Sequence, residues 1–279
     1  MRRLTSYQGL AALVTGASSG IGRALALRLA REGARVALVA RREAELEAVA
    51  SRIRAASGEA LVLPCDVAEP DQVAEVASRA LEHFGRVDLL VNNAGYGHHR
   101  GFLEWDVADM ERVMRVNYLG ALYFTKALLP QLVKRGSGWI VFMASVAGRI
   151  GIPEESAYSA SKFALVGLAE ALSLEVEDCG VHVLTVCPAV IRTPFFDAEA
   201  LERMAPVTRR SMLEPEPLVD AIVGALAKGR RELTFPRRIA PAFAVRALAP
   251  ALMRRLVRRN TIDALARERV PGGSRGGAC

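Results

Sequence analysis

A tyrosine and a lysine four residues apart, Tyr158 and Lys162, form the pair in this sequence best suited to moving a proton. They fall in a helical pattern, in which residues i and i+4 share one face, so both side chains can point into one cleft. A free tyrosine has a pKa of about 10, and a neighbouring cation lowers that pKa because it favours the phenolate. Alone, the pair is common by chance and would be read as two residues of a surface helix; together with the motifs below, it predicts a general acid or base.

A serine can place a substrate oxygen beside this phenol. Ser145 follows the apolar run Trp139–Met143, which reads as a buried strand. Ligands of parallel sheets bind at the carboxyl ends of the strands, where Ser145 would lie. Its hydroxyl is therefore a candidate for holding the reacting oxygen.

A glycine-rich turn offers a site for phosphate. The first apolar run leads directly into Thr15–Gly22, with glycines at 16, 20 and 22, and a helical pattern follows. Backbone N–H groups and the helix dipole at such a turn attract a pyrophosphate. Glycine is needed because a Cβ would block the approach or oppose a positive φ. The turn predicts a dinucleotide site.

Two arginines stand where the ribose of the dinucleotide is expected. An acidic residue at the end of the second strand would bind the 2′-OH of NAD, but Ala40 is followed here by Arg41 and Arg42. A guanidinium suits a 2′-phosphate. The sequence favours NADP(H); the alternative is that both arginines only begin a solvated helix.

Short apolar runs alternate with helical patterns, and the fold that this order predicts would position the candidate catalytic and phosphate-binding residues. Strand, helix and strand in repetition indicate βαβ units and a parallel sheet, and continuous Val, Leu and Ile runs indicate burial on both faces. The fold class is therefore α/β, a doubly wound sheet with helices on both faces. The expected strands are Ala11–Thr15, Arg35–Ala40, Ala60–Pro64, Val87–Val91, Trp139–Met143, His182–Val186 and Glu232–Phe235, and helices are expected over Gly20–Arg31, Arg42–Ala56, Pro70–Phe84, Ser156–Cys179 and Pro217–Lys228.

Taken together, these motifs resemble those of the short-chain dehydrogenase/reductase family. The resemblance covers roughly residues 8–236 and rests on Thr15–Gly22, Asn92–Gly95, Asn117, Ser145, Tyr158 with Lys162, and Pro188–Pro194. It implies a Rossmann-type sheet of seven parallel strands, often in dimers or tetramers. It also implies hydride transfer between nicotinamide and a carbonyl or alcohol.

The resemblance assigns catalytic roles to Asn117, Ser145, Tyr158 and Lys162. Tyr158 would exchange the proton with the substrate oxygen, which Ser145 would polarise. Lys162 would lower the tyrosine pKa and bind the nicotinamide ribose, and Asn117 would hold a water in a proton relay.

The same resemblance gives the NADP(H) contacts. Asp66 and Val67 would meet the adenine, and the segment that begins at Pro188 would close over the nicotinamide. This sequence departs from the family pattern at two positions. Ala189 stands in place of a usual glycine. Ser18 stands where some NADP-preferring relatives have a basic residue, so Arg41 would carry most of the phosphate recognition. The expected contacts are Gly16, Ser18, Ser19, Gly20, Ile21, Gly22, Arg41, Arg42, Asp66, Val67, Asn93, Ala94, Gly95, Tyr158, Lys162, Pro188, Val190, Ile191 and Thr193.

The substrate walls are expected in three loops, Tyr96–Leu103, Ala147–Glu155 and Phe195–Leu213. Their apolar residues fit a lipophilic substrate, or equally core and lid packing: Phe102, Ile150, Ile152, Phe195, Phe196 and Met204. His98 and His99 could face the cleft, but the sequence favours ordinary loop positions. No His, Cys or Asp cluster has metal-ligand spacing, so no metal is expected.

The net charge of +7 is concentrated at the C-terminal end. Residues 229–279 have 12 basic and 3 acidic side chains, whereas residues 1–228 have 25 and 27. We expect a domain over 1–236, a basic amphipathic helical extension over 237–270, broken by Pro241 and Pro250, and a disordered tail over 271–279. The extension could lie on an anionic membrane, or pack on its own domain or another subunit; no motif supports nucleic acid.

The four cysteines have no paired spacing, which favours a reduced, cytoplasmic setting. The function expected is an NADP(H)-dependent oxidoreductase that acts on a carbonyl or secondary alcohol of a lipophilic molecule, as a homo-oligomer. One alternative is a 3-oxoacyl-thioester reductase. Another, of a different class, is an NADP(H)-binding sensor or scaffold without turnover.

Overall fold

A seven-stranded parallel sheet forms the centre of the computed structural model, which describes residues 3–268. The segment 271–279, predicted to be disordered, lies outside the described residues. The strand order is β3-β2-β1-β4-β5-β6-β7, and every neighbouring pair is parallel. The strands are β1 (Ala11–Thr15), β2 (Arg35–Ala40), β3 (Ala60–Pro64), β4 (Leu89–Asn92), β5 (Gly138–Met143), β6 (Val181–Pro188) and β7 (Glu232–Phe235).

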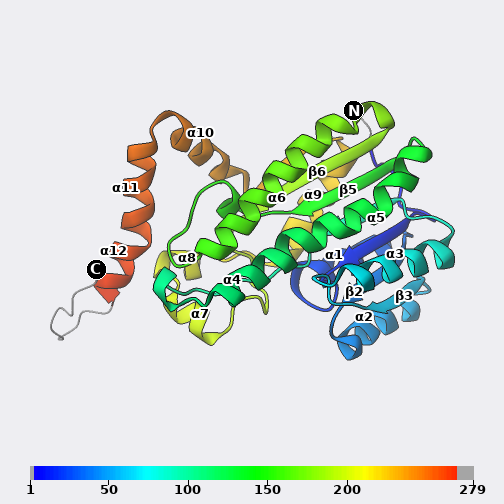
Figure 1. Cartoon of the computed structure of the whole chain (residues 1–279), viewed down its shortest axis with the longest axis horizontal. Helices are drawn as coiled ribbons and strands as arrows, with labels where there is room; N and C mark the ends of the chain where they lie inside the picture. Colours follow the sequence, from blue (N-terminus) through cyan, green and yellow to red (C-terminus); the bar gives the residue numbers. More distant parts are fainter. Residues whose placement is uncertain (1–2, 269–279) are drawn as a thin grey trace.

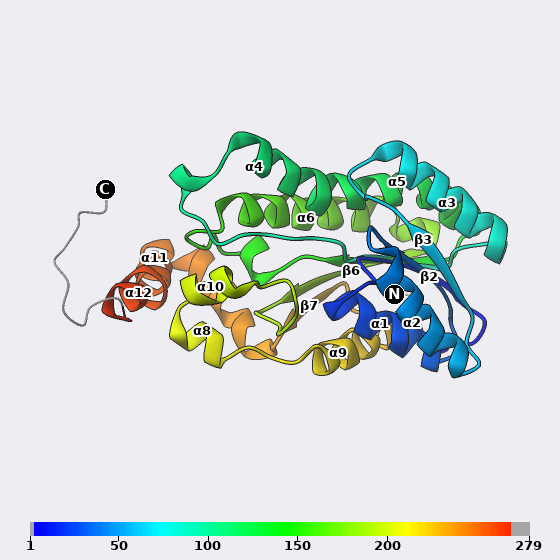
Figure 2. The same ribbon diagram turned by 90° about the horizontal axis from the view of Figure 1, so that it is seen from below.

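Helices cover both faces of this sheet (Figures 1 and 2). One face carries α1 (Gly20–Arg31), α2 (Glu43–Ala55) and α9 (Pro215–Ala227), and the other carries α3 (Pro70–Phe84), α5 (Gly120–Lys134) and α6 (Ser156–Glu175). The remaining helices are α4 (Val107–Met114), α7 (Ala198–Arg203), α8 (Pro206–Arg210), α10 (Ala240–Leu248), α11 (Pro250–Asn260) and α12 (Ile262–Glu268).

Alternation along the strands divides the core into two layers. In β1, Leu13 packs with Phe124 and Phe142 on one face, whereas Val14 packs with Leu25 and Leu38 on the other. Successive strand residues point to opposite faces, so a strand covered on both sides has to be apolar at every position. Residues 11–14 of β1 meet this requirement, and the buried Thr15 at the end of the strand donates its hydroxyl to the Val91 carbonyl at 3.2 Å. The predicted doubly wound α/β fold is confirmed.

Element ends differ from the sequence predictions by a few residues. The fourth strand begins at Leu89 rather than Val87. The preceding Asp88 carboxylate instead accepts a hydrogen bond from the Ala11 backbone N–H, at 2.9 Å. The sixth helix ends at Glu175 rather than Cys179, because a 3₁₀ turn follows and leads to Gly180 in the left-handed region. Backbone hydrogen bonding at such ends is not encoded by hydrophobic periodicity.

The C-terminal helices α10, α11 and α12 form an extension at one end of the molecule (Figures 1 and 2). Pro250 separates α10 from α11, as predicted, whereas Pro241, also expected to break the extension, lies in the first turn of α10. Arg246 of the extension lies over the ring of Phe163 in α6, at 5.0 Å from the centroid, and Met253 is buried. Among residues 3–268, no helix combines the length and apolar character needed to cross a bilayer.

Candidate active site

A cavity of about 720 Å³ lies beyond the carboxyl ends of β1, β2, β4, β5 and β6. The strand order reverses between β1 and β4, and ligands of doubly wound sheets bind at such a switch point. Nearly all of the predicted site residues line this cavity: Gly16, Ser18, Ser19, Gly20, Ile21, Arg41, Arg42, Asp66, Val67, Asn93, Ala94, Gly95, Ser145, Tyr158, Lys162, Pro188, Val190, Ile191 and Thr193. Gly22 and Asn117 stand behind the wall and act on it by packing and hydrogen bonds.

The glycine-rich turn leaves an open cradle at the start of α1. A Cβ at Gly22 would lie 2.3 Å from the carbonyl oxygen of Gly16, so the turn can close only around glycine. Ser19, the residue before the helix, makes no side-chain capping bond, and the first turn has no acidic residue. The first backbone N–H groups of a helix lack partners inside it. The cradle therefore fits an anionic pyrophosphate.

A threonine and an asparagine hold the two sides of the switch point together. Thr15 Oγ1 accepts hydrogen bonds from the backbone N–H groups of Asn93 (2.9 Å) and Ala94 (3.0 Å). Asn93 Nδ2 donates to the Thr15 carbonyl at 2.9 Å. These bonds fix the segment after β4 against the glycine-rich turn, so that Ala94 and Gly95 form part of the cavity floor.

Arg42, rather than Arg41, is anchored to the cradle. Its guanidinium donates to Ser18 Oγ and Ser19 Oγ, both at 3.0 Å, and lies 3.4 Å from Glu45. The sequence analysis assigned most of the phosphate recognition to Arg41. In the structure both Arg41 and Arg42 line the cavity. Ser18, the departure noted above, is a hydrogen-bond partner of Arg42.

The expected adenine contact Asp66 is held by an ion pair. Its carboxylate pairs with Arg112, and its second oxygen accepts from the Ala68 backbone N–H at 3.1 Å. The Asp66 carboxylate is therefore paired with a cation other than Arg41 or Arg42. This end of the cavity presents two arginines without a free carboxylate among the described lining residues.

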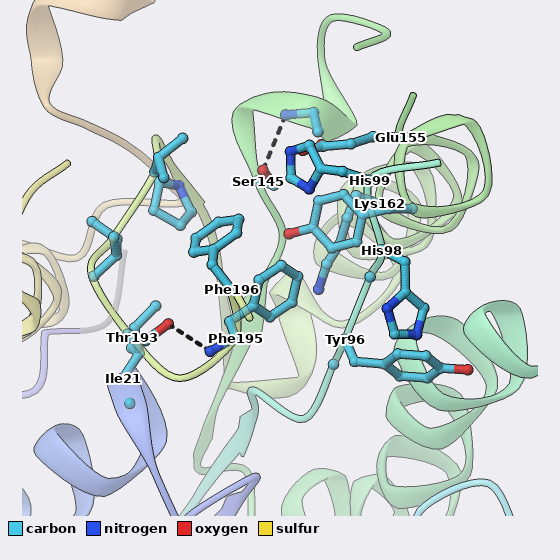
Figure 3. Close-up of a pocket in the computed structure, with 18 of the residues that line it drawn as sticks. Ile21, Tyr96, His98, His99, Ser145, Glu155, Lys162, Thr193, Phe195 and Phe196 are labelled. Carbon is cyan, nitrogen blue, oxygen red and sulfur yellow. Dashed lines mark hydrogen bonds and ion pairs between the residues drawn. The ribbon is translucent and has the colours of Figure 1, made fainter. Parts of the chain in front are cut away.

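The predicted catalytic residues meet at the other end of the cavity. Lys162 is only 3% exposed; its ammonium donates to the Met143 carbonyl at 2.8 Å and lies 5.6 Å from the centroid of the Tyr158 ring. Ser145 Oγ accepts from the Ala147 backbone N–H at 3.1 Å, and the Ser145 side chain is hydrogen-bonded to Tyr158. Figure 3 shows Ser145 and Lys162 facing the same space.

The ionisation of this pair differs from the sequence expectation. Burial raises the pKa of Tyr158, the Glu155 carboxylate raises it further, and the hydrogen bond with Ser145 lowers it only in part. Burial also lowers the pKa of Lys162 to about 8. The sequence expectation of a lowered tyrosine pKa is wrong for this state, because desolvation by burial is the largest influence on Tyr158. Tyr158 therefore keeps its proton at neutral pH.

We expect Lys162→Met to stabilise the fold while it removes activity. In the unfolded chain Lys162 holds its proton up to pH 10.5, but in the fold only to about 8. Its burial therefore costs stability below pH 8, and this cost disappears as pH rises towards 10.5. The variant also loses the hydrogen bond to the Met143 carbonyl, which offsets part of this gain. We therefore expect its free energy of unfolding at pH 7 to exceed that of the parent by about 1–2 kcal/mol.

Denaturant unfolding without cofactor at pH 7 and pH 10 measures this difference. Lys126→Met, which changes a lysine outside the cavity lining, is the matched control and should leave the midpoint nearly unchanged. A Lys162→Met variant less stable than the parent at pH 7 would contradict the desolvation argument.

Asn117 supports the site from a π-helical turn, Arg115–Leu119, between α4 and α5. Its amide accepts from the Tyr96 backbone N–H and donates to the Tyr96 carbonyl and to Ser161 Oγ, all at 2.9 Å. Such π turns recur at functional sites. The side chain thus holds the loop after β4 against α6, and a role in a water relay stays a prediction.

The loop after β6 packs onto the cradle. A Cβ at Gly20 would come within 3.0 Å of the Thr193 side chain, and Ala189 donates its N–H to the Phe235 carbonyl at 2.7 Å. Ile191 is buried and bridges to Leu213. Ala189 thus occupies, with its N–H bonded, the turn position where the resemblance implied glycine.

Only some of the residues that the sequence predicted for the substrate walls line the cavity. Ile152, Phe195, Phe196 and Met204 line the cavity, and the Phe195 ring meets Tyr158 edge-on at 5.5 Å. Two expected wall residues lie elsewhere: Phe102 is 68% exposed in a 3₁₀ turn before α4, and Ile150 is packed into the core. Exposure of a loop residue depends on tertiary packing, which the local sequence does not specify.

Sequence reasoning undervalued a histidine and a glutamate at this wall. His98 and His99 both line the cavity, contrary to the ordinary loop positions that the sequence favoured. His99 Nε2 lies 2.6 Å from Glu155 Oε1, and the His99 ring stands 5.9 Å from Phe196 (Figure 3). Glu155 is also the carboxylate that raises the pKa of Tyr158.

The C-terminal extension reaches the same wall. Thr261, Ile262 and Leu265 line the cavity, so the extension packs against its own domain, one of the alternatives given by the sequence. No sequence signal placed these residues at the site, because more than twenty residues separate them from the last strand.

A dinucleotide cradle and a buried Ser–Tyr–Lys group at a switch point define a nicotinamide-dependent oxidoreductase. The family model described as short chain dehydrogenase matches residues 10–203. The chain belongs to the short-chain dehydrogenase/reductase family.

Two curated proteins have sequences similar to this chain. A Drosophila melanogaster dehydrogenase/reductase SDR family protein 7-like is 43% identical over 66% of this chain, which spans 58% of that relative. A 3-ketodihydrosphingosine reductase from Bos taurus is 38% identical over 79% of this chain and 69% of its own length.

Two solved structures share the fold. A short-chain dehydrogenase/reductase from Burkholderia phymatum in complex with NAD is 28% identical, with a TM-score of 0.83 over 89% of this chain and 96% of that chain. A metagenomic short-chain oxidoreductase in complex with NADP is 34% identical, with a TM-score of 0.67 over 79% of this chain and 91% of its own.

Proposed function

We propose that this chain reduces a carbonyl group of a lipophilic small molecule with NADPH, and that Tyr158 supplies the proton. The observation that carries the proposal is the position of Tyr158. It lies beside Ser145 and Lys162, at the end of the cavity lined by Phe195 and Phe196 and away from the arginines.

The cradle at Gly16–Gly22 and the arginines fit NADPH. Backbone N–H groups at the start of α1 would hold the pyrophosphate, and the guanidinium groups of Arg41 and Arg42 would bind the 2′-phosphate. Lys162 would bind the nicotinamide ribose, and Thr193 would close over the amide. When bound, the cofactor supplies the hydride. One structural relative binds NAD and another NADP, so the preference rests on these arginines.

The protein's own groups then handle the substrate oxygen. Ser145 donates a hydrogen bond that orients the carbonyl oxygen towards Tyr158. Tyr158, whose raised pKa keeps it protonated, transfers its proton to that oxygen as the alcohol forms. The phenolate left behind gains support from Lys162, since an ammonium ion within the same buried site stabilises the anion. Asn117 would hold the relay that restores the proton.

The cavity wall supports an apolar substrate. Ile152, Phe195, Phe196 and Met204 surround the end near Tyr158, and Leu265 of the extension adds to them. Burying each methylene of a substrate chain against such a wall contributes about 0.8 kcal/mol. A relative named for the reduction of 3-ketodihydrosphingosine is consistent with such substrates.

The test is NADPH oxidation by the full chain over ketones and aldehydes of increasing chain length, with oxoacyl thioesters alongside. We expect kcat/KM to rise by up to about fourfold per added methylene until the wall is filled. If the chain turned over oxoacyl thioesters and no other carbonyl, it would be a 3-oxoacyl-thioester reductase. Tight NADPH binding without turnover of any carbonyl would instead support the sensor or scaffold.

A further inference from the structure

Exposed leucines and arginines share one side of the C-terminal extension. In α11, Leu252 is 50% exposed and Leu256 is 39% exposed. Residues four apart stack along a helix, so these leucines form one stripe, and Arg255 and Arg259 form the adjacent stripe. Met253, on the inward side, is buried. We call Leu252, Arg255, Leu256 and Arg259 the outer face of the extension.

The charge of this region is positive and largely unpaired. Across residues 237–266 the sequence has one carboxylate, Asp263, against seven arginines: Arg237, Arg238, Arg246, Arg254, Arg255, Arg258 and Arg259. Asp263 lies 3.5 Å from Arg258. Within the described part of the chain, Arg255 and Arg259 have no carboxylate within ion-pair distance and are exposed. The outer face thus combines apolar area with free positive charge.

The outer face lies close in sequence to residues of the cavity wall. The next turn of chain, with Thr261 and Ile262, lines the cavity, and Ile262 and Leu248 are also exposed. Figures 1 and 2 show the extension at the end of the molecule opposite α2 and α3. A surface that covered the outer face would therefore lie beside the substrate wall.

We propose that the outer face docks on an anionic phospholipid surface. Leucines of an amphipathic helix enter the boundary between headgroups and acyl chains, and long arginine side chains reach the phosphates beside them. A second copy of the chain fits less well. A symmetric pair through this face would set the same arginines against each other, whereas anionic headgroups neutralise them.

A consequence for the substrate rests on the proposed function. In the docked state, the cavity wall that includes Thr261 and Ile262 would lie beside the lipid. An amphiphilic ketone dissolved in the lipid can then enter without crossing water. Docking on lipid does not depend on turnover. An experiment can therefore contradict the docking without contradicting the proposed reduction, and the reverse.

Vesicle flotation of the full chain tests the docking. We expect binding to phosphatidylcholine vesicles that contain phosphatidylglycerol, little binding to phosphatidylcholine alone, and weaker binding as salt increases. The variant Arg255→Glu/Arg259→Glu should lower the partition coefficient at least about 25-fold, because each basic residue near such a surface contributes about fivefold. The matched control Arg31→Glu/Arg52→Glu makes the same charge change on α1 and α2 and should bind like the parent.

A second variant separates lipid from a partner subunit. Leu252→Ser/Leu256→Ser should weaken flotation while the elution volume in size-exclusion chromatography stays constant, because these side chains then contact only lipid. NADPH oxidation with a water-soluble carbonyl should stay at the parent rate in both variants, since neither touches the cavity. Equal flotation of parent and arginine variant, or a smaller oligomer after the leucine change, would overturn the proposal.

Discussion

Tyr158→Phe should lower kcat for carbonyl reduction by about 10²–10⁴-fold, the usual contribution of a positioned general acid. Phenylalanine keeps the ring that meets Phe195 at 5.5 Å and removes only the hydroxyl that is hydrogen-bonded to Ser145. NADPH affinity, measured by fluorescence titration, should change little. The substrate carbonyl would still be oriented, but it would have to take its proton from water.

The matched control is Tyr96→Phe. Tyr96 also lines the cavity, but its hydroxyl points away from Lys162 and Ser145 (Figure 3). Loss of this hydroxyl should leave kcat within about twofold of the parent, because it makes no contact in the transition state. Turnover of Tyr158→Phe at the parent rate would remove the phenol from the mechanism.

The fold could be predicted closely because it depends on periodicity. Buried strands such as β1 and β2 are continuous apolar runs of the length of one strand, and the glycines at 16, 20 and 22 mark the turn between β1 and α1. Chain order and right-handed crossovers then fix the sheet. The residues of the cradle and of the Ser145, Tyr158 and Lys162 group meet for the same reason, since they follow strands or lie one helical turn apart.

The substrate side could not be predicted because it depends on contacts between distant loops. His99 meets Glu155 across 56 residues of sequence, and Leu265 reaches the cavity from beyond the last strand. Neither contact leaves a local pattern in the sequence. The ionisation of Tyr158 was misjudged for a related reason: its pKa depends on burial and on Glu155, both of which require the tertiary structure.

Replacing Arg41 and Arg42 together by alanine should lower kcat/KM for NADPH by about 10²-fold or more and leave kcat/KM for NADH nearly unchanged. A hydrogen bond to a charged group contributes about 1.5–3 kcal/mol, and only NADPH has the 2′-phosphate. Arg41 should contribute more than Arg42, because Arg42 already bonds to Ser18 and Ser19. Steady-state rates with both cofactors, at fixed carbonyl concentration, measure the ratio.

Arg23→Ala separates this recognition from a general loss of positive charge. Arg23 is exposed in the first turn of α1, close to the cradle, but does not line the cavity. Its loss should change the rates with both cofactors by less than about twofold, as expected for a charge that solvent screens. If the double variant lost NADH and NADPH turnover equally, its arginines would be holding the serines of the cradle in place. If neither rate changed, Arg41 and Arg42 would only begin a solvated helix, and the preference for NADPH would lose its physical basis.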